Sequence, residues 1–198
     1  AEAIRPATPK VALMRAAVHI GGGDTDGATE TLAEYQLRLR PGDTPAAPFY
    51  HFAALVAGLA GRLDMAQSTI EEGLATHSES APLLLLAGAI AERRGDLDRA
   101  ERYYEKAAEL DPSLPQVHKN LGDIAYRRGD HETAIECYRR ALEIDPRLGD
   151  DIYTKLGNLL YKQQNREEAL RCWRIALEIN PANEVVRNNL EAVAHVAG

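Results

Sequence analysis

The sequence predicts an all-α protein built as a stack of antiparallel helix pairs. Its composition is rich in Ala, Leu, Glu and Arg, with only two Phe and one Trp, a mixture that favours helix and a core of small side chains. A pattern of small and bulky residues recurs at intervals of about 34 residues, which is typical of repeat architectures. Gly, Asn and Pro stand where the helices of each repeat would end.

An alanine in the middle of each second helix defines the repeat. Ala66, Ala100 and Ala134 lie 34 residues apart, Ala169 follows 35 residues after Ala134, and Ala28 precedes Ala66 by 38 residues. Three further positions also recur in every repeat, and we call each set of equivalent residues a column. These positions lie twelve residues before this alanine, four residues after it and seven residues after it. The alanine and the two later columns share one helix face, and the small residues allow two helices to approach closely. The three columns are Ala16, Ala54, Gly88, Gly122 and Gly157; Leu32, Ile70, Tyr104, Tyr138 and Trp173; and Tyr35, Gly73, Ala107, Ala141 and Ala176.

The first two repeats, at about 9–42 and 47–80, are the least regular. In the first, Tyr35 occupies a position where a small residue is usual, and in the second Gly73 stands where later repeats have Ala. The run Gly21-Gly22-Gly23 predicts a lengthened turn between the first two helices. We therefore expect two degenerate helix pairs at this end of the chain.

Three regular repeats follow at 81–114, 115–148 and 150–183. Each ends in Asp-Pro or Asn-Pro, a pair that stops the second helix and begins the next unit. Gly149 adds one residue between the last two repeats. A Gly or Asn between the two helices suits the left-handed residue that closes a helix; the residues expected in this role are Gly61, Gly95, Gly129 and Asn165.

Residues 184–196 predict one more first helix without a partner. Val186, Leu190 and Val193 form an apolar stripe, and Glu191 stands where earlier repeats have the small residue. We expect a polar-faced capping helix of the kind that solenoids need at their ends.

These columns resemble the tetratricopeptide-repeat family. The resemblance is strongest over 81–183 and weaker over 9–80. It implies a single domain over 9–196, folded as a right-handed superhelical solenoid (an α-α superhelix). In that family the first helices line a concave groove and the second helices form the convex back.

The helix period and this register assign the side chains that would face a partner in the groove. The assigned residues are Leu85, Ala89, Glu92 and Arg93 in 81–114; Gln116, Lys119, Asp123, Tyr126 and Arg127 in 115–148; Asp151, Thr154, Asn158, Tyr161 and Lys162 in 150–183; and Asn188 in the cap. The two earlier repeats add Leu13, Ala17, His51, Leu55 and Leu59. The predicted groove is thus apolar at its N-terminal end and polar at its C-terminal end. The apolar end suits either a ligand, the chain's own N-terminal segment or a second copy.

Some tetratricopeptide-repeat domains hold chaperone C-terminal carboxylates with a clamp of Lys, Asn and Arg. Lys119 matches the first lysine of that clamp, but Asp123 and Lys155 stand where the clamp has asparagines. Because an acid at this position would repel a carboxylate, the sequence disfavours this ligand.

Other function classes lack support in the sequence. The chain contains 23 basic and 30 acidic residues, a formal net charge of −7, which disfavours nucleic acid and anionic membranes as partners. We find no membrane span, catalytic motif, metal-ligand spacing or cofactor motif, so we expect no enzyme activity and no cofactor. Cys137 and Cys172 occupy one column of adjacent repeats, too far apart for a disulfide, and we expect both to stay thiols.

The sequence therefore predicts a non-catalytic scaffold that binds a peptide or protein in the groove. Two alternatives stay open: a regulatory or substrate-docking arm of a larger multidomain enzyme, and a self-assembling structural protein that forms homo-oligomers. The sequence does not determine the compartment, with a cytoplasmic location slightly favoured.

Overall fold

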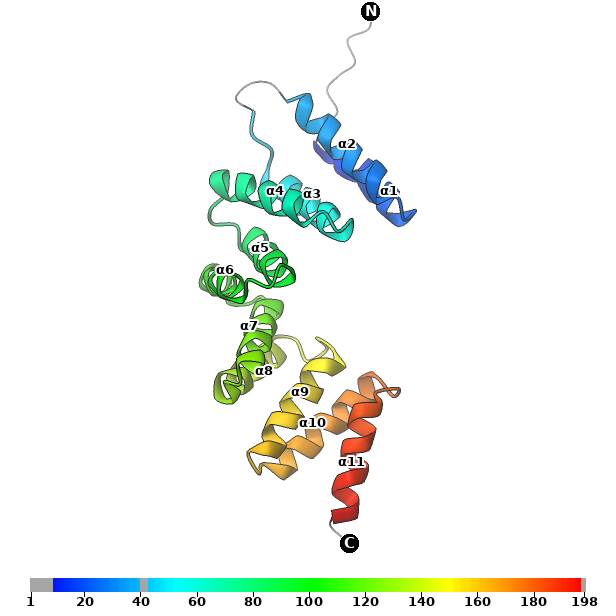
Figure 1. Ribbon diagram of the computed structural model, residues 1–198, viewed down its shortest axis with the longest axis vertical. Coiled ribbons are helices and arrows are strands. Elements are labelled where there is room, and N and C mark those ends of the chain that lie inside the picture. The colour runs from blue at the N-terminus through cyan, green and yellow to red at the C-terminus, as the bar shows by residue number, and fades with distance from the viewer. Residues whose placement is uncertain (1–8, 40–42, 197–198) are drawn as a thin grey trace, which may run out of the picture. The chain divides into compact units, whose positions relative to one another are not determined.

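The computed structural model describes residues 9–39 and 43–196, and these residues form eleven α-helices (Figure 1). Each of the five predicted repeats is a pair of antiparallel helices, so the predicted all-α fold is confirmed. The helices are α1 (Pro9–Gly21), α2 (Thr25–Leu37), α3 (Ala47–Leu59), α4 (Leu63–Thr76), α5 (Ala81–Arg93), α6 (Leu97–Leu110), α7 (Pro115–Arg128), α8 (His131–Ile144), α9 (Asp150–Lys162), α10 (Arg166–Ile179) and α11 (Glu184–Val196).

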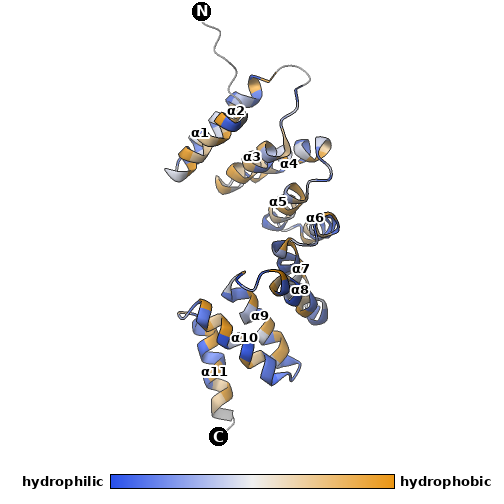
Figure 2. Cartoon of the chain, turned by 180° about the vertical axis from the view of Figure 1, so that it is seen from behind, coloured by the Kyte–Doolittle hydropathy of each residue, from blue (hydrophilic) through white to orange (hydrophobic). Residues whose placement is uncertain are grey.

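The chain forms two compact units, Ala1–Leu110 and Asp111–Gly198. Among the described residues, the first unit contains α1 to α6 and the second contains α7 to α11. Hydrophobic colouring dominates α3 in Figure 2, whereas α8 is largely hydrophilic on the side that is visible. Each unit buries its own hydrophobic clusters between its helices.

The small and bulky columns are matched in size within each helix pair. The three repeats with an aromatic residue in the bulky column have glycine opposite it, whereas Ala54 faces the aliphatic Ile70. A Cβ atom added to Gly122 would lie 2.7 Å from the ring of Tyr138, and one added to Gly157 would lie 2.6 Å from the indole of Trp173. Since carbon atoms normally stay about 3.5–4.0 Å apart, these glycines make room for the aromatic ring.

The residues that looked irregular in the first two repeats also have packing roles. Tyr35 is buried and its ring centroid lies 4.9 Å from that of Phe49, so it joins α2 to α3. A Cβ atom at Gly73 would lie 2.7 Å from the Cβ atom of Tyr50. The side chain of Tyr50 therefore occupies the space that a Cβ atom at position 73 would need.

Two expectations about the turns are wrong. The left-handed residue of the fifth repeat is Gln164, with φ of 65°, and Asn165 instead precedes α10 with φ of −81°. Gln164 lies five residues before Ala169, as Gly129, with φ of 78°, lies five before Ala134. The run from Gly21 to Gly23 does not lengthen its turn, because Gly23 holds this same position five residues before Ala28.

The expected single helix at the C-terminal end is α11, which packs against α10. Val186 and Val193 are buried, and Leu190 packs against the same cluster. The Arg166 guanidinium donates a hydrogen bond of 2.9 Å to the Val193 carbonyl, and Asn183 caps the helix by accepting from the Val186 N–H at 3.1 Å. These contacts fix α11 beside the last helix pair.

Candidate functional site

In the first unit, the predicted groove residues of α5 are tied to neighbouring helices. Leu85 and Ala89 are half-buried. Glu92 accepts a hydrogen bond of 3.1 Å from the Tyr104 hydroxyl, and Arg93 donates one of 2.7 Å to the Gly58 carbonyl at the end of α3. The polar side chains of this face therefore have structural partners.

The earlier residues of the same predicted face are more varied. Leu55 and Leu59 on α3 are exposed, as expected for an apolar surface, and Ala17 on α1 is exposed as well. Leu13 is half-buried against the hydrophobic cluster of the first unit, and the His51 ring lies 3.2 Å from the Pro82 carbonyl.

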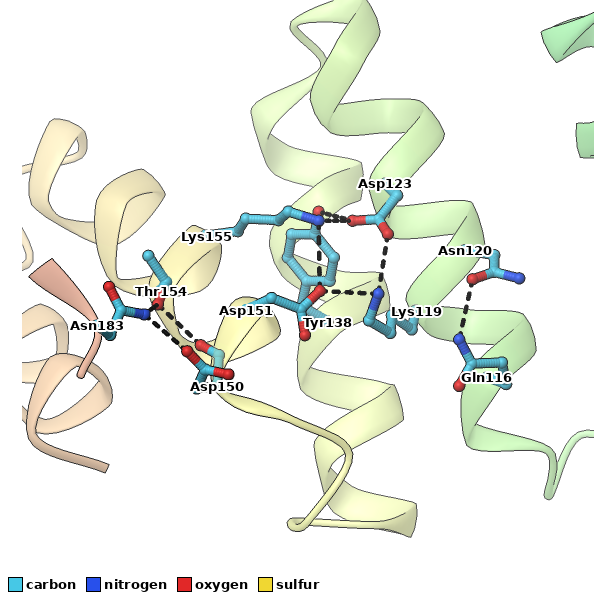
Figure 3. A network of polar contacts seen from close by, with 10 residues as sticks. All are labelled: Gln116, Lys119, Asn120, Asp123, Tyr138, Asp150, Asp151, Thr154, Lys155 and Asn183. Atoms are coloured by element: carbon cyan, nitrogen blue, oxygen red, sulfur yellow. Dashed lines mark hydrogen bonds and ion pairs between the residues drawn. The ribbon is translucent and has the colours of Figure 1, made fainter. Parts of the chain in front are cut away.

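In the second unit, four charged side chains of α7 and α9 form one network (Figure 3). Lys119 lies 3.1 Å from Asp123 and 2.9 Å from Asp151, and Lys155 lies 2.6 Å from Asp123. The Tyr138 hydroxyl of α8 donates a 2.7 Å hydrogen bond to Asp123. The Asp123 side chain is only 13% exposed, so it is the buried centre of the network.

The network holds the Asp123 carboxyl and the Lys119 ammonium in their charged forms. Burial raises the pKa of the Asp123 carboxyl, but hydrogen bonds from Lys155 and Tyr138 and the charge of Lys119 outweigh it, so the pKa is lowered. Burial lowers the pKa of the Lys119 ammonium, but Asp151 and Asp123 outweigh it, so this pKa is raised. Burial and the neighbouring Asp123 carboxylate raise the pKa of Tyr138. None of these groups is therefore poised to exchange a proton near neutral pH.

Beside this network, α7, α9, α10 and α11 line an open cavity of about 360 Å³, which we call the cap pocket. Its aromatic wall consists of Tyr126, Tyr161 and Trp173, with 5.4 Å between the ring centroids of Tyr161 and Trp173. The helix α11 supplies an aliphatic wall. The remaining lining residues are Asn158, Lys162, Val185, Asn189, Ala192 and Val193.

Asn158 stands at the centre of the polar contacts in the cap pocket. Its side-chain oxygen accepts hydrogen bonds from Trp173 Nε1 at 3.0 Å and from Asn189 Nδ2 at 2.9 Å. Because an indole N–H can only donate, the atom facing Trp173 must be the amide oxygen. This arrangement leaves the Asn158 NH₂ group as the donor that the side chain can offer to a ligand.

The structure separates the other predicted residues from the cap pocket. Thr154 donates to the Asp150 carbonyl and accepts from Asn183, at the turn before α11. Gln116 donates to Asn120 on the surface of α7. Arg127 and Asn188 are exposed, and neither lines the pocket.

Three family models match successive parts of the chain. A TPR repeat model matches residues 122–164, and two tetratricopeptide-repeat models match 81–124 and 151–183. Together they span 81–183, which is 103 of the 198 residues. The chain belongs to the tetratricopeptide-repeat family.

Solved structures of other tetratricopeptide-repeat proteins share this fold. PilF of Pseudomonas aeruginosa is 19% identical, with a TM-score of 0.78 over 90% of this chain and 79% of its own. MamA is 20% identical, with a TM-score of 0.70 over 84% of this chain and 94% of its own. YrrB, described as having an unusual peptide-binding site, is 19% identical, with a TM-score of 0.68 over 94% of each chain. No curated protein sequence gives a significant match.

Four residues that the sequence assigned to the groove line the cap pocket: Tyr126, Asn158, Tyr161 and Lys162. The sequence did not assign Trp173 or the lining residues of α11 to a site. Trp173 was assigned only to the core, although a buried indole needs an acceptor for its N–H. Val185, Asn189 and Ala192 follow one another at i, i+4 and i+7 on α11. Residues at this spacing lie on one face of a helix, so the sequence could have indicated that this face of α11 packs towards the α9–α10 pair.

Across the part of the chain that the structure describes, no group of three or more His, Cys, Asp or Glu side chains is arranged to hold a metal ion. No helix there has both the length and the apolar character needed to cross a membrane.

Proposed function

We propose that this tetratricopeptide-repeat chain is a non-catalytic interaction module that binds a peptide or protein segment over α7, α9 and α11. The observation that carries the proposal is the cap pocket, an open cavity of about 360 Å³ with aromatic and amide side chains in its walls. A few fixed polar groups in a largely apolar cavity are typical of ligand sites. Tetratricopeptide repeats generally mediate protein interactions, and the YrrB structure is described as containing a peptide-binding site.

The chemistry of this face favours binding over catalysis. The lining residues of the cap pocket include no His, Cys, Asp or Glu, the groups that most often transfer protons or form covalent intermediates. In the adjacent network, the pKa of Asp123 is lowered and that of Lys119 is raised, away from neutral pH. Asp123 and Lys119 therefore stay charged near neutral pH, which suits a role in holding the surface together.

A peptide-display selection tests this function directly. Wild-type protein, a Tyr126→Ala/Tyr161→Ala variant and an Arg174→Ala control are each screened against the same library, and circular dichroism checks the fold of each. Arg174 is exposed on α10 and does not line the pocket. We expect the double variant to lose affinity for selected peptides by about tenfold or more, because aromatic contacts dominate such sites. Equal binding by the double variant would exclude this face as the ligand site.

A second candidate function, self-association, is favoured by the outer face of α1. Val11, Met14 and Val18 follow a helical spacing and are 45%, 61% and 76% exposed. An exposed apolar stripe of this kind usually marks a contact surface. Light scattering over a range of concentrations tests this candidate. A concentration-dependent mass that Met14→Glu/Val18→Glu abolishes would support it, and a constant monomer mass would refute it.

A further inference from the structure

The cap pocket offers a ligand hydrogen-bond donors and one positive charge. Lys162 is its only charged lining residue, and it makes no ion pair with any residue that the structure describes. The Asn158 oxygen is already occupied by Trp173 and Asn189, so its NH₂ group is what remains for a ligand. No carboxylate lines the pocket.

The Asp123 carboxylate of the adjacent network is already paired with other groups. Asp123 lies one helical turn before Tyr126, but both of its oxygens are engaged, by Lys119, Lys155 and Tyr138. In a chain whose net charge is −7, the pocket is thus a local site for an anion beside an apolar cavity. Charge complementarity at such a rim mainly selects the partner.

The apolar part of the pocket suits an aromatic side chain. Tyr161 and Trp173 lie with ring centroids 5.4 Å apart and ring planes tilted by 40°. Tyr161 is 38% exposed, so a third ring can meet it in the geometries that aromatic pairs prefer, while Trp173, only 2% exposed, packs behind it. The volume of about 360 Å³ exceeds that of a single side chain, so flanking ligand backbone fits as well.

We propose that the cap pocket binds a segment of a partner protein in which an aromatic residue is followed by Asp or Glu. The aromatic ring lies between the tyrosines and the α11 wall, the acidic side chain meets Lys162, and a backbone carbonyl accepts from Asn158. The inference rests on the proposed peptide-binding function and specifies the ligand of that same site.

Trp173 is the only tryptophan of the chain and forms a wall of the pocket, so its fluorescence reports occupancy directly. The probe is an acetylated and amidated hexapeptide, Gly-Ser-Phe-Glu-Ser-Gly, which has no tryptophan and one negative charge. Matched peptides replace Phe with Ala, or Glu with Gln or Lys. The 198-residue chain is titrated with each peptide, and the indole N–H signal in nitrogen–proton correlation spectra reports on the site.

We expect saturable binding of the Phe-Glu peptide. Binding should be about threefold weaker with Gln in place of Glu, as for an exposed ion pair, and at least about tenfold weaker with Ala in place of Phe. Lys162→Glu should weaken binding of the Phe-Glu peptide about tenfold and strengthen binding of the Phe-Lys peptide. The control Lys106→Glu changes the same charge on exposed α6 and should leave both affinities unchanged.

Several results would overturn the inference: no binding of the Phe-Glu peptide, equal binding of the Ala-Glu peptide, or equal effects of Lys162→Glu and Lys106→Glu. The display selection separates this failure from failure of the proposed function. Selected peptides that depend on Tyr126 and Tyr161 but lack an aromatic-acidic pair would leave the function standing and refute the ligand chemistry. If no displayed peptide depends on these tyrosines, both fail.

Discussion

Replacing Gly122 with Ala tests whether the glycine column exists to make room for an aromatic ring. The new Cβ atom would lie 2.7 Å from Tyr138 Cδ1 and Cε1 and 3.3 Å from the Cβ atom of Cys137. Since non-bonded carbons prefer about 3.5–4.0 Å, the Tyr138 ring must move by about 1 Å. That ring is fully buried, and its hydroxyl donates to Asp123, so it cannot move without disturbing both the core and the network.

The expected magnitude follows from three opposing contributions. Overpacking costs about 1–3 kcal/mol, and weakening the charged hydrogen bond to Asp123 costs up to about 1.5 kcal/mol. Alanine is better than glycine inside a helix by about 1 kcal/mol. We therefore expect Gly122→Ala to lower the free energy of unfolding by about 2 kcal/mol.

The same substitution should be harmless when the ring is absent. The native pair of Ala54 and Ile70, buried at 0% and 2% exposure, shows that alanine fits opposite isoleucine. In a Tyr138→Ile background, Gly122→Ala should stabilise by up to about 1 kcal/mol. The coupling energy between the two positions is then about 3 kcal/mol, at the upper end for residues in direct contact.

Urea unfolding of the four proteins, followed by circular dichroism and by Trp173 fluorescence, measures this coupling. Effects of Gly122→Ala that agree within about 0.5 kcal/mol in the two backgrounds would mean that the positions are independent. That result would refute the size-matching explanation of the repeat.

Three further predictions concern the second unit. Asp123→Asn removes the buried carboxylate that both lysines contact, leaving them only the more exposed Asp151, and should lower the free energy of unfolding by about 2 kcal/mol at neutral pH. Because the pKa of Asp123 is lowered in the folded state, this stabilisation is present above the ordinary aspartate pKa of about 3.9 and is lost as pH falls through the folded-state pKa. The urea midpoints of wild type and variant should therefore converge in acid. Burial raises the pKa of Cys172 to about 11 and the pKa of Cys137 above its usual range. Both thiols should therefore react slowly with an alkylating reagent at about pH 8 until the protein unfolds. Rapid labelling of either cysteine in the native protein would contradict this prediction. Deleting residues 184–198 should uncover the side of the α9–α10 pair that α11 covers and raise aggregation in light scattering, and an equally soluble and stable truncated chain would refute the capping role.

The helix pairs were predictable because their signals are local. Proline follows the second helix in each of the three regular repeats, and the small and bulky columns recur at a nearly constant interval. The turn residue of the fifth repeat was missed because Gln164 adopts the left-handed conformation that Gly129 adopts elsewhere. Residue type alone suggested Asn165, whereas counting back five residues from Ala169 identifies the correct position.

The cap pocket was only half predictable, because its walls come from parts of the sequence that are far apart. Tyr126, Asn158 and Tyr161 were found from the helix period of α7 and α9. The register of α11 could not be transferred in the same way. On α9, Thr154 is covered by Asn183 from the turn that follows α10. Asn188 is the residue of α11 that corresponds to Thr154, and it is exposed, because no described helix follows α11. Its neighbour Asn189 instead donates a hydrogen bond to Asn158.

The contacts also divide the polar residues of this face into two groups with different constraints. Each buried aromatic of the bulky column carries an N–H or O–H that needs an acceptor, and the adjoining first helix supplies it through Glu92, Asp123 or Asn158. Substitution of Glu92, Asp123 or Asn158 should destabilise the fold, because a buried N–H or O–H donor would lose its hydrogen-bond acceptor. Tyr161 and Lys162 lie one turn beyond Asn158, and no core hydrogen bond among the described residues engages them. Lys162 is exposed and can change with little effect on folding, whereas Tyr161 also contacts the ring of buried Trp173. We propose that partner selection depends on these two positions.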